Sequence, residues 1–247
     1  MDALEITYQP ILNLATGMIE KCEALCRPRE AGADLAAFVD AAERDGSIKA
    51  FTNRVIDEVI AEWQKNGPPG IDVSINLSVA NLRENDLVKR VEKVLKKNRF
   101  DGKRLWFELD DRAQTINDDA QLKVVADLAK LGTHFSIDSF GDDFTQATLY
   151  ELQRLAVGEI KVGERYVRDA AGNMLHRGII NSTVAVAKHL GIGVSAKGIE
   201  NEGIAALMLR LGCTHGQGYY FARPMASTVV AALVEKMART GPLPSGR

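Results

Sequence analysis

Short apolar runs alternate with longer amphipathic segments along this chain of 247 residues. The apolar runs have the length of buried strands, and the amphipathic segments have the period of a helix. In one segment Val88, Val91, Val94 and Leu95 recur at helical spacing, with lysines on the opposite face. The pattern predicts strands over residues 6–14, 19–27, 71–77, 105–109, 135–138, 159–162, 193–196 and 218–221. It predicts helices over residues 34–45, 51–65, 82–98, 118–131, 174–190, 202–211 and 227–239.

The connection between the first two predicted strands is much shorter than the others. It consists of Ala15, Thr16 and Gly17, and a loop of this length joins antiparallel strands, because parallel strands need a longer crossover. The alternation of strands and helices that follows predicts a parallel barrel. We therefore predict an α/β fold, a TIM-like (β/α)8 barrel with one antiparallel strand, over residues 1–240, and a flexible tail at 241–247. A doubly wound open sheet is the alternative, but the hairpin and the eight strands count against it.

Charge and cysteine content exclude several classes of protein. The 31 basic and 33 acidic residues give a net charge of −2, which provides no general attraction to nucleic acid or to an acidic membrane. Three cysteines, a low and odd number, favour free thiols in a reducing compartment. The amino terminus lacks the pattern of a signal peptide, and no apolar stretch is long enough to cross a bilayer. We expect a cytoplasmic domain that binds neither nucleic acid nor membrane.

Polar side chains stand at or near the ends of otherwise apolar predicted strands. They are Glu23, Asn76, Glu108, Asp138 and Lys161. Buried charge without a partner is costly, so these residues require either stabilising salt bridges at the barrel mouth or a ligand. Because barrel active sites lie at the carboxyl ends of the strands, the five together favour a ligand site. Three carboxylates and an amide oxygen are a plausible ligand set for Mg²⁺, Mn²⁺ or Ca²⁺.

Lys197 conflicts with a site for two metal ions. It follows the predicted strand 193–196, and an ammonium group repels a second cation. The constellation therefore has the character of a phosphoryl-transfer or phosphodiesterase site that has lost part of its metal machinery.

A series of short motifs gives the chain a resemblance to a known family. The motifs follow the expected order through nearly the whole chain, and a series of this length is very specific. They are Tyr8-Gln9-Pro10-Ile11, Glu23-Ala24-Leu25, Ile75-Asn76-Leu77-Ser78, Glu108-Leu109-Asp110-Asp111, Ile137-Asp138-Ser139-Phe140-Gly141, Ile160-Lys161-Val162-Gly163, Ala196-Lys197-Gly198-Ile199-Glu200 and Gln217-Gly218-Tyr219-Tyr220-Phe221. In these motifs the chain resembles an EAL domain, a family that hydrolyses the bacterial second messenger cyclic di-GMP in a barrel with one antiparallel strand.

The resemblance implies roles for particular residues. Four residues match the ligands of the family's first metal: Glu23, Asn76, Glu108 and Asp138. Lys161 matches the lysine that positions the attacking water, and Glu200 matches a further residue of the catalytic site. The residues expected to contact the nucleotide are Gln9, Glu23, Leu25, Arg27, Asn76, Asp111, Lys161, Gln217 and Pro224. A guanidinium such as that of Arg27 suits a phosphate group.

Three departures from the family pattern change the expected chemistry. Ser139 stands where active members have the second of two aspartates, and Gly163 stands where they have an aspartate. Lys197 replaces the glutamate proposed as the family's general base. Residues 141–146 also differ from the family's loop, which shapes the substrate site and the dimer contact. Two-metal displacement needs both ions, and the loss of a general base alone costs about 10²–10⁴ in rate.

We therefore predict a degenerate EAL domain without an intact catalytic set, which acts as a cyclic di-GMP receptor or regulatory module in bacterial signalling. It requires no cofactor, although the four remnant ligands could hold one Mg²⁺ or Mn²⁺. A further hypothesis is that the Lys197 ammonium takes the place of the missing second metal and pairs with Asp138 or a nearby carboxylate. A protein partner or other domains of a longer protein are expected, and a homodimer could form. The alternatives are an interaction module without nucleotide affinity and a weakly active phosphodiesterase.

Overall fold

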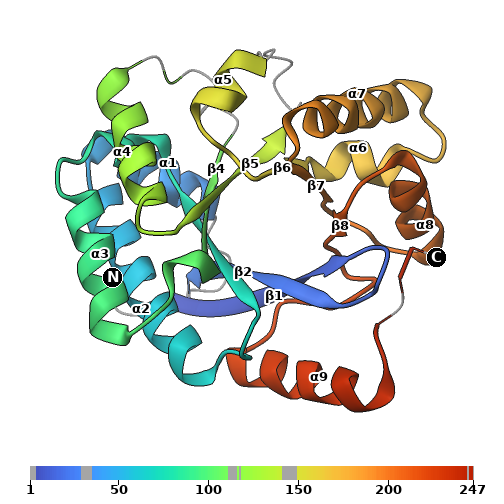
Figure 1. Cartoon of the computed structure of the whole chain (residues 1–247), viewed down its shortest axis with the longest axis horizontal. Coiled ribbons are helices and arrows are strands. Elements are labelled where there is room, and N and C mark those ends of the chain that lie inside the picture. Colours follow the sequence, from blue (N-terminus) through green and yellow to red (C-terminus); the bar gives the residue numbers. More distant parts are fainter. Residues whose placement is uncertain are drawn as a thin grey trace.

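A closed barrel forms the centre of the molecule and helices surround it (Figure 1). The computed structural model describes residues 4–28, 35–110, 116, 118–140, 149–243 and 245–246. In this part of the chain the strands follow one another around the barrel in sequence order. They are β1 (Leu4–Asn13), β2 (Ile19–Pro28), β3 (Asp72–Leu77), β4 (Leu105–Leu109), β5 (His134–Phe140), β6 (Glu159–Val162), β7 (Gly193–Ala196) and β8 (His215–Gly216). The predicted barrel is confirmed, and the open sheet is excluded.

The outer elements are mostly those that the periodicity predicts. The helices are α1 (Leu35–Asp45), α2 (Ile48–Asn66), α3 (Leu87–Asn98), α4 (Asp119–Ala129), α5 (Leu149–Arg154), α6 (Glu164–Asp169), α7 (Met174–Leu190), α8 (Glu202–Leu211) and α9 (Ser227–Thr240). Two short 3₁₀ helices, η1 (Val79–Arg83) and η2 (Gly102–Arg104), precede α3 and β4. Because η1 is a separate turn, the helix predicted from residue 82 begins only at Leu87.

Strand β1 is the reversed strand of the barrel. It pairs antiparallel with β2 on one side and with β8 on the other, while the pairs from β2 to β8 are parallel. The three-residue connection forms a tight turn in which Gly17 has a φ of 70° and donates its N–H to the Asn13 carbonyl at 2.8 Å. Glycine adopts this left-handed conformation without steric cost. The antiparallel start deduced from loop length is therefore confirmed.

The eighth strand is the main error of the sequence prediction. Residues 218–221 form a turn, in which Phe221 donates its N–H to the Gly218 carbonyl at 3.1 Å, and β8 lies before them at His215–Gly216. A β-carbon on Gly218 would lie 2.0 Å from the Ile199 carbonyl oxygen, so this glycine permits a close backbone approach. The helices α5 and α6 are also missing from the prediction, because six residues each are too few to establish a hydrophobic period.

Polar and apolar residues alternate along the strands, and the polar ones point into the barrel. In β6, Glu159 and Lys161 alternate with Ile160 and Val162, and all four are buried. Strands β2, β3, β5 and β7 place buried Lys21, Glu23, Ser74, Ser136 and Ser195 on the same inner surface. The apolar residues face the helices; Tyr8, for instance, packs on Trp63 of α2 with a ring distance of 4.8 Å. The barrel interior is therefore polar, although TIM barrels are usually filled with branched apolar side chains.

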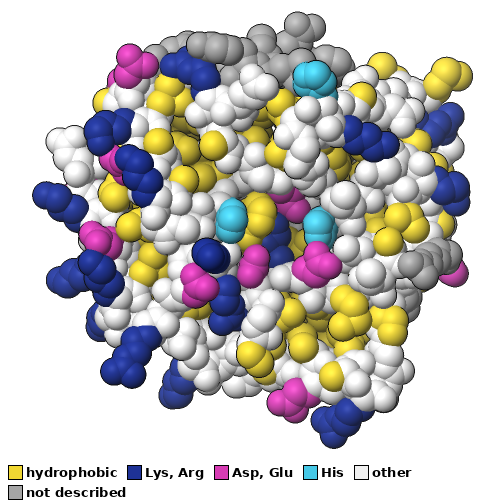
Figure 2. Space-filling model, viewed as in Figure 1, with side chains coloured by type: hydrophobic (Ala, Val, Ile, Leu, Met, Phe, Trp, Pro, Cys, Tyr) yellow, Lys and Arg dark blue, Asp and Glu magenta, His cyan; other side chains and the backbone are white. Residues whose placement is uncertain are grey.

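A buried ion pair lies at the end of the barrel where the parallel strands begin. Lys21 Nζ contacts Glu159 Oε2 at 2.6 Å and lies 3.9 Å from the centre of the Trp106 ring. His215 Nδ1 is 3.7 Å from Glu159 Oε1, and its Nε2 is 2.8 Å from Glu20 Oε2. In the face that Figure 2 shows, acidic, basic and histidine side chains surround the centre of the barrel. This cluster links β2, β6 and β8 electrostatically.

Replacing Glu159 by glutamine should destabilise the protein by about 3 kcal/mol at neutral pH, because it leaves the buried Lys21 without its counter-charge. Burial opposes ionisation of Glu159, but Lys21 and Lys161 outweigh it and lower the pKa of Glu159 below its ordinary value of 4.5. The unfolded state therefore binds more protons just below pH 4.5, and the contribution of ionised Glu159 is lost as the pH falls. Urea unfolding at a series of pH values measures the free energy of unfolding of E159Q and of the wild type. The difference between these two free energies should become smaller below about pH 4.5.

The control for this prediction is Glu5→Gln, because Glu5 is an exposed residue of β1. It should change the free energy of unfolding little at any pH. The assigned titration of Glu159 would be contradicted if E159Q and the wild type differed in free energy of unfolding by the same amount down to low pH.

The last described residues lie against the barrel. Gly246 donates its N–H to the Leu14 carbonyl at 3.1 Å, close to the β1–β2 turn. The flexibility expected for residues 241–247 stays a prediction. Within the described ranges, no helix has both the length and the apolar character required to cross a membrane.

Candidate functional site

Two buried carboxylates share one lysine at the carboxyl end of the barrel. Lys161 of β6 is fully buried; its Nζ forms a short hydrogen bond with Glu108 Oε1 of β4 and lies 3.5 Å from Glu23 Oε2 of β2. The strand alternation aims all three side chains inward, and the closed barrel brings them together from distant positions in the chain. The five predicted site residues therefore do meet, but three of them neutralise one another in the present arrangement.

Three amide side chains surround these buried charges. We call Lys161, Glu108 and Glu23, together with the three amides, the inner layer. Asn76 donates its Nδ2 to Glu23 Oε1 at 3.1 Å, and Gln217 donates its Nε2 to Glu23 Oε2 at 2.9 Å and to Gln9 Oε1 at 3.1 Å. Gln9 in turn donates to the Ala222 carbonyl at 3.3 Å. Glu23 is thus held by one ammonium and two amides, whereas Oε2 of Glu108 and Oε1 of Gln217 are buried without a hydrogen-bond partner.

Lys197 closes the mouth over Asp138. Its Nζ lies 2.8 Å from both carboxylate oxygens of Asp138, so the pair is bidentate. About a fifth of each side chain is exposed, 22% for Lys197 and 17% for Asp138. The adjacent Ser139 has a φ of 53° and donates its N–H to Asp138 Oδ1 at 2.8 Å. The expectation that Lys197 turns inward and pairs with Asp138 is therefore confirmed.

The charges of this layer shift the pKa values of its members in opposite directions. Burial by itself would raise the pKa of Glu23, but Lys161 and Lys197 outweigh burial and lower it to about 2. Burial and the neighbouring Glu23 raise the pKa of Glu108 to about 7. Burial opposes the charge on both lysines, yet the carboxylates around them raise the pKa of Lys161 and of Lys197 above the ordinary value. Both ammonium groups are consequently protonated at neutral pH.

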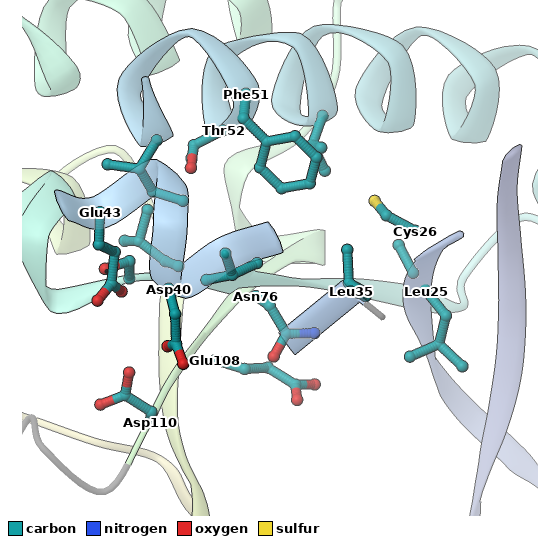
Figure 3. A pocket seen from close by; sticks show the side chains of 16 residues that line it. Leu25, Cys26, Leu35, Asp40, Glu43, Phe51, Thr52, Asn76, Glu108 and Asp110 are labelled. Atoms are coloured by element: carbon teal, nitrogen blue, oxygen red, sulfur yellow. Dashed lines mark hydrogen bonds between the residues drawn. The ribbon is translucent and has the colours of Figure 1, made fainter. Parts of the chain in front are cut away.

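Two cavities open beside the inner layer. The larger, of about 520 Å³, extends from Asn76 and Glu108 to apolar side chains of α1 and α2 such as Phe51 (Figure 3). In the close view Asp40 and Asp110 stand at the same side of this cavity as Glu108. The smaller, of about 200 Å³, is lined by Gln9, Glu23, Leu25, Glu164, Lys197, Gly198, Glu200, Gln217, Gly218 and Tyr219. A polar floor with apolar and aromatic walls is typical of sites for small molecules.

In this arrangement lysines contact oxygens of the predicted metal ligands, and the metal site stays a prediction. Among the described residues, no group of three or more His, Cys, Asp or Glu side chains is placed to hold a metal ion. The reason is visible in the contacts, because Lys161 occupies Glu108 Oε1 and Lys197 occupies both oxygens of Asp138.

The remaining predicted residues are dispersed. Glu200 is 55% exposed and lies 3.9 Å from Arg168 Nε, at the outer rim of the smaller cavity. Gly163 precedes α6 in extended conformation, and Pro224 is half-buried after the 218–221 turn. The side chain of Arg27, together with Asp111 and the 141–146 loop, lies outside the described residues.

Several residues around the site were not predicted from the sequence. Asp40, Glu164 and Tyr219 line the cavities, and the buried Lys21–Glu159 pair lies beneath the inner layer. The alternation of Glu159 and Lys161 along one strand indicates that both residues share a face, but it does not indicate that Lys21 is the partner of Glu159. Asp40 and Glu164 lie on helices, where acidic residues at exposed positions carry no such signal.

Comparison with known proteins places these features in a family. The model of the EAL domain matches residues 1–224. The bifunctional diguanylate cyclase/cyclic di-GMP phosphodiesterase MucR of Pseudomonas aeruginosa is 27% identical over 237 residues, which cover 94% of this chain and 34% of MucR. The cyclic di-GMP phosphodiesterase PdeR of Escherichia coli is 29% identical over 230 residues, which cover 91% of this chain and 34% of PdeR. The chain thus spans about a third of the length of these curated relatives.

A solved structure supports the same assignment. The PaMucR phosphodiesterase in complex with c-di-GMP has a TM-score of 0.82 and 27% identity to this chain, covering 90% of this chain and 92% of that one. The family model covers most of the sequence, and the fold and motif order agree with it. The chain therefore belongs to the EAL domain family.

Proposed function

We propose that this EAL domain binds cyclic di-GMP and hydrolyses it slowly or not at all. The observation that carries the proposal is the bidentate pair of Lys197 with Asp138, 2.8 Å from both carboxylate oxygens. A cation built into the protein stands where the family resemblance implies the glutamate proposed as the general base. The site is thereby balanced in charge without a bound ion.

The chemistry of the mouth suits a cyclic dinucleotide. Such a ligand carries two phosphodiester anions and two flat bases. The partly exposed ammonium of Lys197 lines the smaller cavity with Gln9 and Gln217, which supplies a cation and amide donors for phosphate oxygens. The half-exposed ring of Tyr219 at the same cavity and the apolar wall of the larger cavity offer surfaces for the bases. The names of MucR and PdeR, which refer to this nucleotide, support the same ligand class.

Lys161 and Lys197 are poor at activating water. A general base must be unprotonated at the working pH, whereas the carboxylates around Lys161 and Lys197 raise the pKa of both groups against the effect of burial. Ser139 and Gly163 add no negative charge to the mouth. Binding without turnover allows the ligand to shift a conformational population and survive, which is the behaviour of a receptor.

Calorimetric titration with cyclic di-GMP, in Mg²⁺ and then in chelator, tests this function. We expect binding of similar affinity in both conditions and intact nucleotide on chromatography afterwards. Lys197→Met should weaken binding about tenfold or more, because it removes a charge-assisted contact of about 1.5–3 kcal/mol. Lys188→Met is the matched control, since Lys188 is an exposed lysine of α7, and it should leave the affinity unchanged.

Each other outcome points to a different function. An absence of binding would favour an interaction module without nucleotide affinity. Recovery of linear dinucleotide would identify a phosphodiesterase and contradict the proposal.

A further inference from the structure

Positive charge is concentrated in one short stretch of the chain. Residues 87–104 contain eight basic and two acidic residues, a net charge of +6, whereas the whole chain has −2. The remainder therefore carries a net charge of −8. Such a separation creates a local positive potential on a protein whose overall charge is slightly negative.

The fold exposes this charge on the outside of the barrel. Helix α3 buries Leu87, Val91, Val94 and Leu95 against its neighbours. Its opposite face presents the exposed lysines 89, 93, 96 and 97, and exposed Arg99 and Lys103 continue the surface beyond the helix. Figure 2 shows Lys and Arg side chains gathered over α2, α3 and α4 along one edge of the molecule. We call the surface formed by Lys89, Lys93, Lys96, Lys97, Arg99 and Lys103 the basic face.

Most cations of the basic face have no acidic partner among the residues that the structure describes. Lys96 pairs with Glu92 at 2.6 Å, and on α4 Lys123 and Lys130 share Asp127. In contrast, no carboxylate of the described residues forms an ion pair with Lys89, Lys93, Lys97, Arg99 or Lys103. Like charges at i and i+4 destabilise a helix by a few tenths of a kcal/mol, so the row 89, 93 and 97 costs stability that pairing would remove.

We propose that the basic face docks an acidic polypeptide segment of a partner protein. Eight residues of helix rise about 12 Å, so Lys89 and Lys97 span the length of about four residues of an extended chain. Alternate Asp or Glu side chains of such a segment can each face one lysine. The basic face lies outside the barrel mouth, so the docking does not depend on nucleotide binding.

The surface lacks the features that membranes and nucleic acids require. Among the described residues, the exposed large hydrophobic side chains are Met18, Met174, Leu175, Tyr219 and Val229, and they lie on other elements. A bilayer-binding helix needs apolar side chains that insert below the headgroups, and a single-stranded nucleic acid is held by stacking on aromatic rings. Exposed lysines without large apolar side chains on the same elements match the carboxylates of an acidic segment best.

The test uses a fluorescent poly-glutamate peptide and fluorescence anisotropy. The wild-type chain should bind it with an affinity that falls as salt rises, since screening weakens exposed charge pairs. The variant K89E/K93E/K97E should lose binding at least about tenfold. The matched control K65E/K188E/K236E changes the net charge equally at exposed lysines of α2, α7 and α9, and it should keep the affinity of the wild type.

Circular dichroism and thermal melts show whether both variants fold, and K89Q/K93Q/K97Q provides a milder replacement should the charge reversal unfold α3. The proposal would be overturned if the K89E/K93E/K97E variant and the control lost affinity for poly-glutamate equally. It would also be overturned if the wild type did not bind the peptide at low salt. Tighter binding to phosphatidylserine vesicles or to single-stranded DNA than to poly-glutamate would also overturn it. Self-association that the K89E/K93E/K97E variant abolishes, without poly-glutamate binding, would assign the surface to a second copy instead.

Discussion

Replacing Lys161 by methionine should reduce the free energy of unfolding by about 3–5 kcal/mol, one of the largest effects expected of a single substitution in this chain. Lys161 is fully buried and contacts both Glu108 and Glu23. Methionine fills a similar volume but leaves two buried carboxylates without their counter-charge. Urea denaturation followed by circular dichroism measures the loss.

The Lys161→Met variant should lose more free energy of unfolding above pH 7 than below it. Burial and Glu23 already raise the pKa of Glu108 to about 7. For a raised carboxyl pKa the folded state binds more protons than the unfolded state, so stability falls as the pH rises toward 7. Removing Lys161 also removes the main attraction that favours ionised Glu108. Below pH 7 a proton can neutralise Glu108, and this reduces the loss of free energy of unfolding.

A double variant separates the charge effect from packing. Glu108→Gln combined with Lys161→Met removes one member of the buried pair together with its partner, so part of the stability should return and the pH dependence should weaken. If the double variant were as unstable as the sum of both single variants at every pH, the ammonium would not be the reason for the loss.

Introducing the three carboxylates that the family resemblance implies at positions 139, 163 and 197 should produce hydrolysis of cyclic di-GMP. The variant S139D/G163D/K197E is expected to form linear dinucleotide at least about 100-fold faster than the wild type in Mg²⁺ or Mn²⁺, because it returns a general base and negative charge to the mouth. The backbone permits these changes. Aspartate tolerates the left-handed conformation of Ser139, whose φ is 53°, and Gly163 is extended with φ −60° and ψ 143°.

Two measurements make this prediction specific. Thermal melts should show that the divalent ion stabilises the triple variant and leaves the wild type unchanged, since ligand binding to the folded state raises its stability. Lys197→Met, which removes the ammonium without adding a carboxylate, is the control and should gain no turnover. A triple variant that binds the ion and the nucleotide yet forms no product would show that these three positions do not account for slow hydrolysis.

Local sequence patterns were sufficient for most of the fold. The three-residue connection before Met18 required β1 to be antiparallel to β2. A connection this short cannot join parallel strands, which need a crossover of about a dozen residues or more. Residues 174–190 and 202–211 form helices with the predicted bounds, since their apolar residues recur at the helical period over several turns. The turn at 218–221 was misread as a strand because a short apolar run has no period that distinguishes the two.

The candidate site was predictable in its membership and not in its pairing. The position of polar residues at strand ends brought Glu23, Glu108, Asp138 and Lys161 into one group. The charge at position 197 predicted a pairing with Asp138 or a nearby carboxylate, and the structure shows Asp138. The sequence does not indicate that Lys161 bonds to Glu108 more closely than to Glu23. Strand register and barrel closure decide that choice.

The sequence by itself determined most of the elements, the reversed first strand and the chemical character of the site, because these depend on short-range spacing and on residue type. Only the tertiary structure decided that Glu200 stands at the outer rim and that Lys21 pairs with Glu159, 138 residues away. Periodicity shows which residues of one strand share a face. It carries no information on which faces meet when eight strands close around a common interior, and that closure places buried charges within hydrogen-bond distance.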